Sequence, residues 1–213
     1  MISAARNEYR LFWEAMSGAL VVELLLEEMQ IGYERVVVDM AAGEHKTPSF
    51  LSLNPTGQIP ALMLPEGDVI GESAAIILTI GERHPHTTLV PLPGESDRPA
   101  FLRWLIYMAA SPYMTFVQFN HPERYSEEAH SHPALIGNAK ARLLSQFSLL
   151  DQATSGSPYF LARGLSALDL YIYMLVEFFP DHEQLFAGCR NLAGLHSSVA
   201  NFASVRLVRP RHG

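Results

Sequence analysis

The sequence has 213 residues, of which 48% are hydrophobic and 17% charged, and its formal net charge is −7. This is the balance of a folded protein with a real core, and no basic run is long enough to indicate a nucleic-acid groove. Three arginines near the C-terminus (Arg206, Arg209 and Arg211) predict only a solvated tail. The single cysteine, Cys189, excludes an internal disulfide framework or cysteine-based zinc site and fits a reducing compartment.

Membrane and metal sites are not expected either. The N-terminus shows no basic segment followed by an apolar run, and no apolar stretch approaches the length of a membrane span. A cytoplasmic protein without membrane contact is therefore the expectation. The nine histidines include His121, His130 and His132, which follow no standard metal spacing and which we interpret as exposed loop residues.

The first part of the chain alternates strand and helix patterns. Residues 9–13 are a short aromatic strand pattern, and residues 17–29 carry apolar residues at helical spacing, with Gly32 as the expected stop. Residues 34–39 contain three consecutive valines, a run typical of a strand buried on both faces. A strand, a helix and a second such strand predict a βαβ unit with a parallel strand pair.

A hairpin and a second helix are predicted next. Residues 61–64 and 68–70 read as two strands that turn at Pro65-Glu66-Gly67, and residues 72–83 carry a broad apolar stripe at helical spacing. Between residues 85 and 99 the chain has four prolines, which indicates a linker.

Everything beyond the linker has a helical pattern. The predicted helices cover residues 98–119, kinked by Pro112, residues 127–153, with a late start caused by Pro133, residues 168–179 and residues 189–205. The sequence thus predicts an α/β N-terminal domain over residues 1–85, a linker over 86–95 and an all-α C-terminal domain over 96–213.

Residues 54–73 offer a peptide-like ligand a matching set of groups. Ile59 precedes Pro60, and a cis bond there would turn the Ile59 backbone N–H and C=O outward, where an extended peptide can pair with them. Gly71-Glu72-Ser73 opens a helix whose unpaired N–H groups, with the Ser73 hydroxyl, suit a carboxylate, while Glu72 suits an ammonium group. Glutathione, with its peptide middle and zwitterionic γ-glutamyl head, satisfies all of them.

The order Asn54-Pro-x-Gly-x-Ile-Pro-Ala-Leu, a hairpin, then Glu72-Ser73-Ala-Ala-Ile closely resembles the N-terminal domain of glutathione transferases. The resemblance covers nearly the whole chain. Ser166-Ala-Leu-Asp169 is similar to the capping box in the core helix of the family's second domain, a structural pair.

The resemblance implies a thioredoxin-like N-terminal domain, a helical domain that shapes a hydrophobic co-substrate pocket, and a homodimer. By similarity, Ile59 with Pro60 would bind the cysteinyl backbone, and Glu72 with Ser73 the γ-glutamyl head. Gln58 stands where many relatives place a polar or basic residue facing the glycyl end. Lys46, or His45 beside it, would supply the charge for the glycyl carboxylate; the alternative is that both lie on a solvated loop.

Activation of the glutathione sulfur needs a donor that favours the thiolate, the nucleophilic form. In the family this donor lies at the end of the first strand or the start of the first helix, and Ser17 is the only hydroxyl in residues 11–19. Ser17 falls where serine-type relatives place their activating residue; it is equally suited to capping the helix. The tyrosine of tyrosine-type enzymes, the cysteine of cysteine-type enzymes and the Ser-Ser-Cys pattern of maleylacetoacetate isomerases are missing.

Two hypotheses follow for the function. The first is a glutathione transferase that conjugates glutathione to a small hydrophobic electrophile, or reduces a peroxide with it. The second is a glutathione-binding or regulatory module that keeps the fold without catalysis. The candidates for lining the co-substrate pocket lie on the long helix after the linker: Tyr107, Met108, Ser111, Tyr113 and Met114. The alternative is that most of them belong to the core of the helical domain.

Overall fold

The computed structural model describes residues 8–213. The chain divides into two compact units, which we call unit 1 (the chain up to Val90, together with Asn201–Gly213) and unit 2 (Pro91–Ala200). The sequence-based division carried the helical domain to residue 213, whereas the structure returns the last residues to unit 1. Across the described residues, no helix combines the length and apolar character needed to cross a membrane.

Unit 1 is built on a four-stranded mixed sheet in the order β2-β1-β3-β4. The strands are β1 (Tyr9–Trp13), β2 (Tyr33–Val37), β3 (Ala61–Met63) and β4 (Val69–Ile70). β1 and β2 are parallel, and the other two pairings are antiparallel. The predicted βαβ unit and hairpin are therefore confirmed.

The prediction that the valine run forms a strand buried on both faces is wrong. β2 is an edge strand with β1 as its neighbour in the sheet, and Val37 is 60% exposed. Val38, just beyond the strand, is buried, and its N–H donates to the Trp13 carbonyl over 2.9 Å. The run is apolar because its last residue closes the core, not because the whole strand lies inside.

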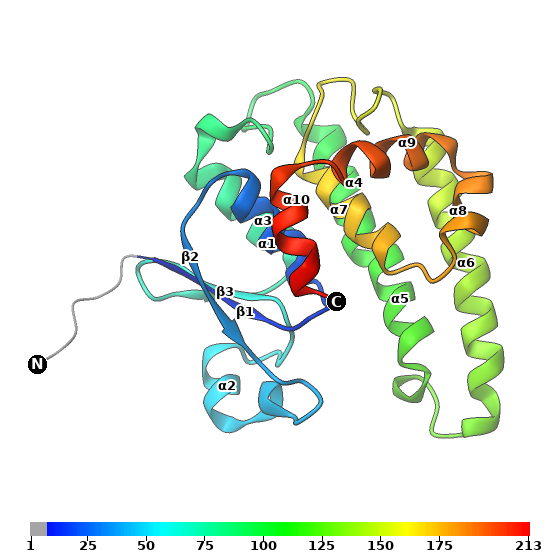
Figure 1. The fold of residues 1–213 in the computed structure, drawn as a ribbon. Helices are drawn as coiled ribbons and strands as arrows, with labels where there is room; N and C mark the ends of the chain where they lie inside the picture. The colour runs from blue at the N-terminus through cyan, green and yellow to red at the C-terminus, as the bar shows by residue number, and fades with distance from the viewer. Residues whose placement is uncertain (1–7) are drawn as a thin grey trace, which may run out of the picture. The chain divides into compact units, whose positions relative to one another are not determined.

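The helices of unit 1 are α1 (Ala19–Glu28), α2 (Pro48–Leu53), α3 (Ser73–Arg83) and α10 (Ala203–Val208), with single 3-10 turns at Glu44–Lys46, Pro85–Thr87 and Arg209–Arg211. Of these helices, α1 packs against β1 and α3 against β3. α1 ends at Glu28 with Met29 as its C-cap, and Gln30 follows in the left-handed region, so the helix stops before the predicted Gly32. Figure 1 shows α10 running alongside α1, against which it packs.

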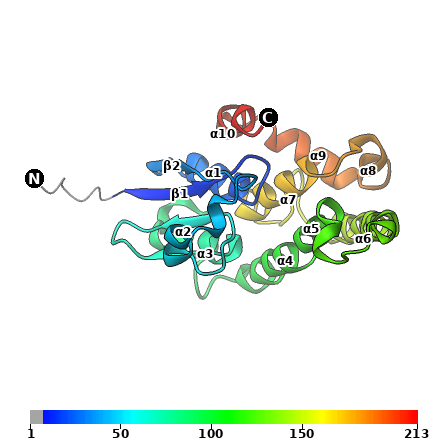
Figure 2. The same ribbon diagram turned by 90° about the horizontal axis from the view of Figure 1, so that it is seen from below.

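Unit 2 is all-helical. Its helices are α4 (Arg98–Ala110), α5 (Pro112–Asn120), α6 (His132–Ala153), α7 (Ala167–Glu177), α8 (His182–Gly188) and α9 (Arg190–Val199), with 3-10 turns at Pro122–Arg124 and Ala129–Ser131. α5 and α6 pack side by side, as Figures 1 and 2 both show. Pro133 lies in the first turn of α6 and gives it the predicted late start.

Two helix predictions in unit 2 need correction. Pro112 separates α4 from α5 instead of only kinking one helix, because a proline opens the new helix where it lacks the N–H to continue the old one. The single helix predicted over residues 189–205 is two, α9 and α10, and they belong to different units. The helix α8 before them was not predicted.

The capping box of α7 is confirmed. The Ser166 N–H donates to Asp169 Oδ2 over 2.7 Å, and the Ser166 side chain and the N3 backbone complete the reciprocal pair. Asp169 Oδ1 also accepts from the Phe160 N–H over 2.7 Å. Both residues are completely buried, so this pair fixes the start of the most buried helix of unit 2.

Candidate functional site

The sheet of unit 1 brings three distant stretches of chain to one edge. Phe12 pairs with Ala61, so the end of β1 lies beside the start of β3. Leu62 pairs with Ile70, so the end of β4 reaches the same edge. The residues just beyond these strand ends are 14–18, 57–60 and 71–73, and they contain all the predicted site residues except Lys46.

The Ile59–Pro60 peptide bond is cis. Ile59 lies just before β3, outside the ladder that this strand makes with β1 and β4, and its side chain is buried with 6% exposed. Within residues 8–213, neither its N–H nor its C=O forms a backbone-to-backbone hydrogen bond. Its side chain is thus fixed in the core while its main-chain groups are suited to pair with an added peptide strand.

The segment after β4 turns sharply into α3, which begins at Ser73. Glu72 has φ 60° and ψ 109°, a backbone conformation that costs a non-glycine residue about 1–3 kcal/mol. Its side chain is exposed and Ser73 is half-buried. A charged residue held in a strained conformation at a helix N-terminus favours a functional role for this corner.

Asn54, the first residue of the motif, joins two of these stretches and was not among the predicted site residues. It is buried, its Nδ2 donates to the Gln58 carbonyl over 2.9 Å, and its Oδ1 accepts from the Thr56 hydroxyl over 2.9 Å. The same side chain packs against Gly71, where an added Cβ would lie 3.6 Å from Asn54 Oδ1. Asn54 therefore organises this loop, a role that its burial and its hydrogen bonds show and the sequence alone did not.

Lys46 is held close to Gln58 by a hydrogen bond to the carbonyl of the preceding residue, Gly57. The Lys46 ammonium donates to the Gly57 carbonyl over 2.9 Å, and both Lys46 and Gln58 are exposed. Gly57 has φ +57°, and a Cβ there would come within 2.9 Å of Lys46 Nζ and of the His45 carbonyl. This close approach requires glycine and holds the Lys46 charge at the loop that carries Gln58.

Ser17 has both of its hydroxyl functions engaged. Its Oγ donates to the Glu14 carbonyl over 2.8 Å and accepts from the Ala19 N–H over 3.1 Å, at the first residue of α1. The Ser17 hydroxyl thus accepts from the first N–H of α1, although the N-cap position itself is Gly18. To donate to a sulfur, the hydroxyl proton must turn away from the Glu14 carbonyl.

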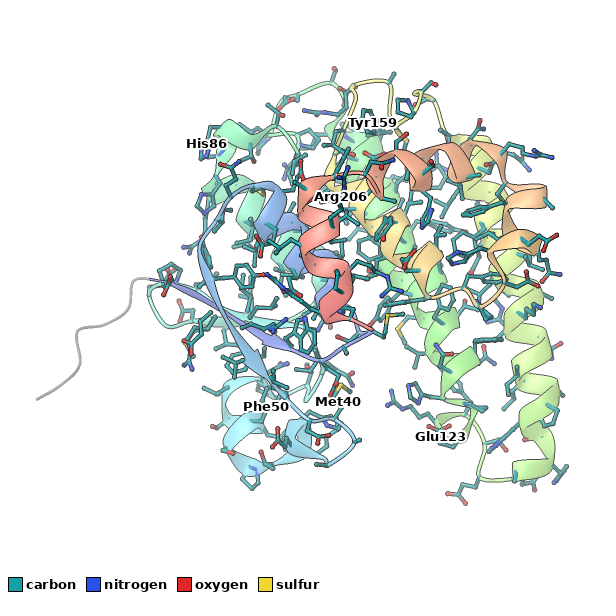
Figure 3. All side chains as sticks on the ribbon, viewed as in Figure 1. Met40, Phe50, His86, Glu123, Tyr159 and Arg206 are labelled. Atoms are coloured by element: carbon teal, nitrogen blue, oxygen red, sulfur yellow. The ribbon has the colours of Figure 1, made fainter. Side chains whose placement is uncertain are left out.

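The loop that carries Ser17 is tied down from two sides. The Glu14 carboxylate accepts from its neighbour Ala15 over 3.2 Å and from the N–H of Met40 (labelled in Figure 3) over 2.8 Å. Met16 has φ 49°, and its N–H donates to Nδ1 of His212 over 3.2 Å. The hydrogen bond to Glu14 comes from Met40, after β2, and the hydrogen bond from Met16 goes to His212, near the end of the sequence.

Below this loop, the carboxylate of Glu23 is completely buried and collects several donors. They are Trp13 Nε1 at 2.7 Å, Arg211 at 2.6 Å, His212 Nε2 at 2.9 Å and the Tyr33 hydroxyl at 3.0 Å. Burial acts to raise the Glu23 pKa, but the hydrogen bonds of His212, Arg211 and Tyr33 outweigh it and hold the pKa below its usual range. The expectation that Arg211 is merely solvated is therefore wrong.

Cys189 lies outside this site, in unit 2. Cys189 is buried in unit 2, and burial together with the nearby Asp151 charge raises its pKa to about 11, so it is a thiol and not a thiolate at neutral pH. In the part of the chain that the structure describes, no group of three or more His, Cys, Asp or Glu side chains is arranged to hold a metal ion.

The candidates for the co-substrate pocket separate in the structure. Met108 is fully buried in the core of unit 2, whereas Met114 is 48% exposed. Tyr107 and Ser111 are half-buried, and the Tyr113 ring lies 6.3 Å from that of Phe178. Because the helix is interrupted between α4 and α5, the five residues do not share one face of a single helix.

The fold and the site together define a class. A thioredoxin-like βαβ unit with a cis-proline ahead of β3, followed by an all-helical unit, is the architecture that the sequence resemblance implied. Residues 16–83 match the family model described as "Glutathione S-transferase, N-terminal domain".

Individual relatives agree with this class. The uncharacterized GST-like protein YncG of Escherichia coli K12 is 28% identical over 198 residues, covering 92% of this chain and 94% of the relative. Glutathione S-transferase 1 of Dianthus caryophyllus is 31% identical over 165 residues, covering 73% and 69%. A solved sphingomonad glutathione S-transferase complexed with glutathione superposes with a TM-score of 0.80 at 25% identity, covering 96% and 98%. The chain belongs to the glutathione S-transferase superfamily.

Proposed function

We propose that this protein is a glutathione transferase whose unit 1 binds glutathione and activates its sulfur for attack on a small hydrophobic electrophile. The observation that carries the proposal is the meeting of Ile59, Glu72 and Ser73 at one sheet edge, with the Ile59 main chain outside the ladder. Membership of the superfamily and the matched residues 16–83 support it.

Binding uses main-chain and charged groups in complementary places. The Ile59 N–H and C=O pair with the cysteinyl backbone as an added strand does. The N-terminus of α3 at Ser73 receives the γ-glutamyl carboxylate, and the exposed Glu72 carboxylate receives its ammonium group. Cis-Pro60 ends the segment and leads into β3.

The glycyl end of glutathione carries a carboxylate and needs a positive partner. Lys46 is the cation held beside Gln58, through its bond to the Gly57 carbonyl. We assign Lys46 to this carboxylate, with Gln58 as an additional polar contact. An exposed pair of this kind contributes modestly, about 1 kcal/mol or less, so it adjusts affinity more than it decides it.

The chemical step requires the thiolate. Lowering the thiol pKa by about two units corresponds to roughly 2.7 kcal/mol, and one hydrogen bond to a charged acceptor supplies about 1.5–3 kcal/mol. Ser17 at the start of α1 is the donor assigned to this bond. The thiolate then attacks the electrophilic carbon; an S–C bond forms while the leaving group departs or a proton is taken up. With a peroxide instead, two glutathiones give one disulfide, one alcohol and one water.

Ser17→Ala is the first test. It removes the donor to sulfur, so we expect turnover in a stopped-flow conjugation assay to fall by about tenfold or more, with glutathione affinity changed less than threefold. Ser52→Ala is the matched control, because the Ser52 hydroxyl also donates to a carbonyl three residues earlier, that of Ser49, over 2.8 Å, but on exposed α2. Equal turnover in Ser17→Ala, Ser52→Ala and the parent protein would sink the assignment.

A second candidate is a glutathione-binding module without catalysis, favoured by the two hydrogen bonds that already occupy the Ser17 hydroxyl. The two functions differ in the state of the bound sulfur. Thiolate absorbance of the glutathione complex near neutral pH supports the enzyme, whereas binding without that absorbance supports the module. The homodimer expected from the resemblance is tested separately, by light scattering.

A further inference from the structure

We infer that His212 is a positioning residue for the Ser17 loop: its imidazole joins the buried Glu23 carboxylate to the Met16 amide and so sets the backbone from which Ser17 acts. The inference rests on the proposed function for its catalytic consequence. It assigns a role to the last residues of the sequence, which fold back onto unit 1.

The hydrogen bonds determine the state of the imidazole. The Met16 N–H is a donor, so Nδ1 of His212, 3.2 Å away, accepts and carries no proton. The proton is then on Nε2, which donates to Glu23 Oε2 over 2.9 Å. Trp13 Nε1 also lies 3.1 Å from this nitrogen, but it donates to the same Glu23 oxygen over the shorter 2.7 Å. His212 is thus a neutral bridge with one nitrogen committed to each side.

The His212 bridge is buried and rigidly held. The side chain of His212 is buried, with 2% of the residue exposed, and its ring lies 4.9 Å from that of Trp13 at the end of β1. Glu23 cannot move away, since Arg211 and Tyr33 also bind it. The fixed carboxylate orients the imidazole, as a third group orients a catalytic base, although here the imidazole positions an amide and touches no substrate.

The contact acts at the residue directly before Ser17. Met16 is 42% exposed and has φ 49°, so its own side chain does little to hold the loop in this left-handed conformation. Two hydrogen bonds fasten the loop from outside it: the Met16 N–H donates to His212, and the Glu14 carboxylate accepts from the Met40 N–H. Without the first, Ser17 would sample other positions, and small displacements of a reacting group are expensive in rate.

Two substitutions separate the two nitrogens of His212. In His212→Asn, the amide oxygen lies near the place of Nδ1 and can accept from Met16, while the contact to Glu23 is lost. In His212→Gln, the longer side chain can donate to Glu23 from near the place of Nε2, while the contact to Met16 is lost. We expect His212→Gln to lower kcat roughly tenfold with less than a threefold change in KM for glutathione. We expect His212→Asn to keep most of the kcat of the parent protein.

The thermal midpoints should run in the opposite order, with His212→Asn the less stable variant, because it deprives a buried carboxylate of a donor. A general structural role would lower kcat and stability together. Equal kcat values in the two variants, or a lower kcat in His212→Asn than in His212→Gln, would overturn the inference.

Amide hydrogen exchange at Met16, followed by NMR at a temperature where both variants are folded, tests the bridge without any assay of activity. Exchange should be at least about tenfold faster in His212→Gln than in His212→Asn; equal exchange overturns the inference. The proposed function is judged separately by Ser17→Ala. Unchanged turnover in that variant, with Met16 exchange still controlled by His212, would remove Ser17 as the activating residue and leave the bridge standing.

Discussion

At the scale of single residues, Glu23 is the most consequential side chain outside the proposed binding site. It lies in the apolar stretch Val-Val-Glu-Leu-Leu-Leu of α1 and has no exposed surface. A buried carboxylate is tolerated only when its charge is matched by donors, and here Arg211, at 2.6 Å, brings a full positive charge. The segment that supplies this charge is far away in sequence, so the pairing joins the two ends of unit 1.

The first prediction from this residue concerns acid stability. The pKa of Glu23 is lowered in the folded protein, so its contribution to stability is complete above the unfolded-state value near 4.5 and is lost as pH falls through the folded value. We expect the parent protein to lose more unfolding free energy below about pH 4.5 than Glu23→Gln does, in urea titrations at a series of pH values.

The same variant gives a second prediction at neutral pH. Glu23→Gln removes the nearer of the two carboxylates that Arg211 contacts and leaves it with Glu27 at 3.1 Å. The buried donors around Glu23 then lose a charged acceptor, which should cost about 1–3 kcal/mol of unfolding free energy. Glu66→Gln is the control, since Glu66 also pairs with an arginine, Arg83, but on the surface. We expect that variant to unfold at the same denaturant concentration as the parent. Equal destabilisation by both variants would contradict the role given to burial.

At the scale of elements, what could be predicted followed local rules. The strand at residues 9–13, the hairpin around Pro65-Glu66-Gly67 and the late start of α6 all have signals within a few residues. The break between α9 and α10 has no such signal, because no proline or glycine lies at residues 200–202. It arises because α9 buries Leu192 and Leu195 in unit 2, while α10 buries its own apolar residues in unit 1. Tertiary packing of this kind is invisible to a local pattern.

The start of α7 gives a prediction at the same scale. Asp169 satisfies the buried N–H groups of Ser166 and Phe160. Asp169→Ala leaves both without an acceptor and should cost about 2–4 kcal/mol of unfolding free energy. Asp181→Ala is the matched control, because the Asp181 side chain caps α8 by accepting from Gln184 in an exposed position, where about 1 kcal/mol is expected. Calorimetry on the two variants measures the difference, and a control that cost as much as Asp169→Ala would contradict the argument from burial.

At the scale of the whole molecule, the proposed site was predictable where it depends on a short ordered motif. Residues 54–73 lie within one strand–hairpin–helix segment, so their order along the chain already implies that they meet. The contacts that hold the Ser17 loop are different. His212 and Glu23 are 189 positions apart, and nothing near His212 in the sequence indicates a buried residue. The only local sign was Glu23 itself, a single glutamate inside the apolar stretch of α1. A buried glutamate needs a partner, but the sequence does not indicate which residue provides it.

The division of the chain leads to the last prediction. Val208 on α10 and Val199 on α9 are both fully buried, yet they belong to unit 1 and unit 2. Val→Ala at either site removes similar apolar volume and should cost about 1–3 kcal/mol. If α10 stabilises α1, hydrogen exchange measured by mass spectrometry should rise in residues 8–90 for Val208→Ala and in residues 91–200 for Val199→Ala. Faster exchange in α7 or α9 for Val208→Ala, with α1 unchanged, would show that the last residues stabilise unit 2 instead.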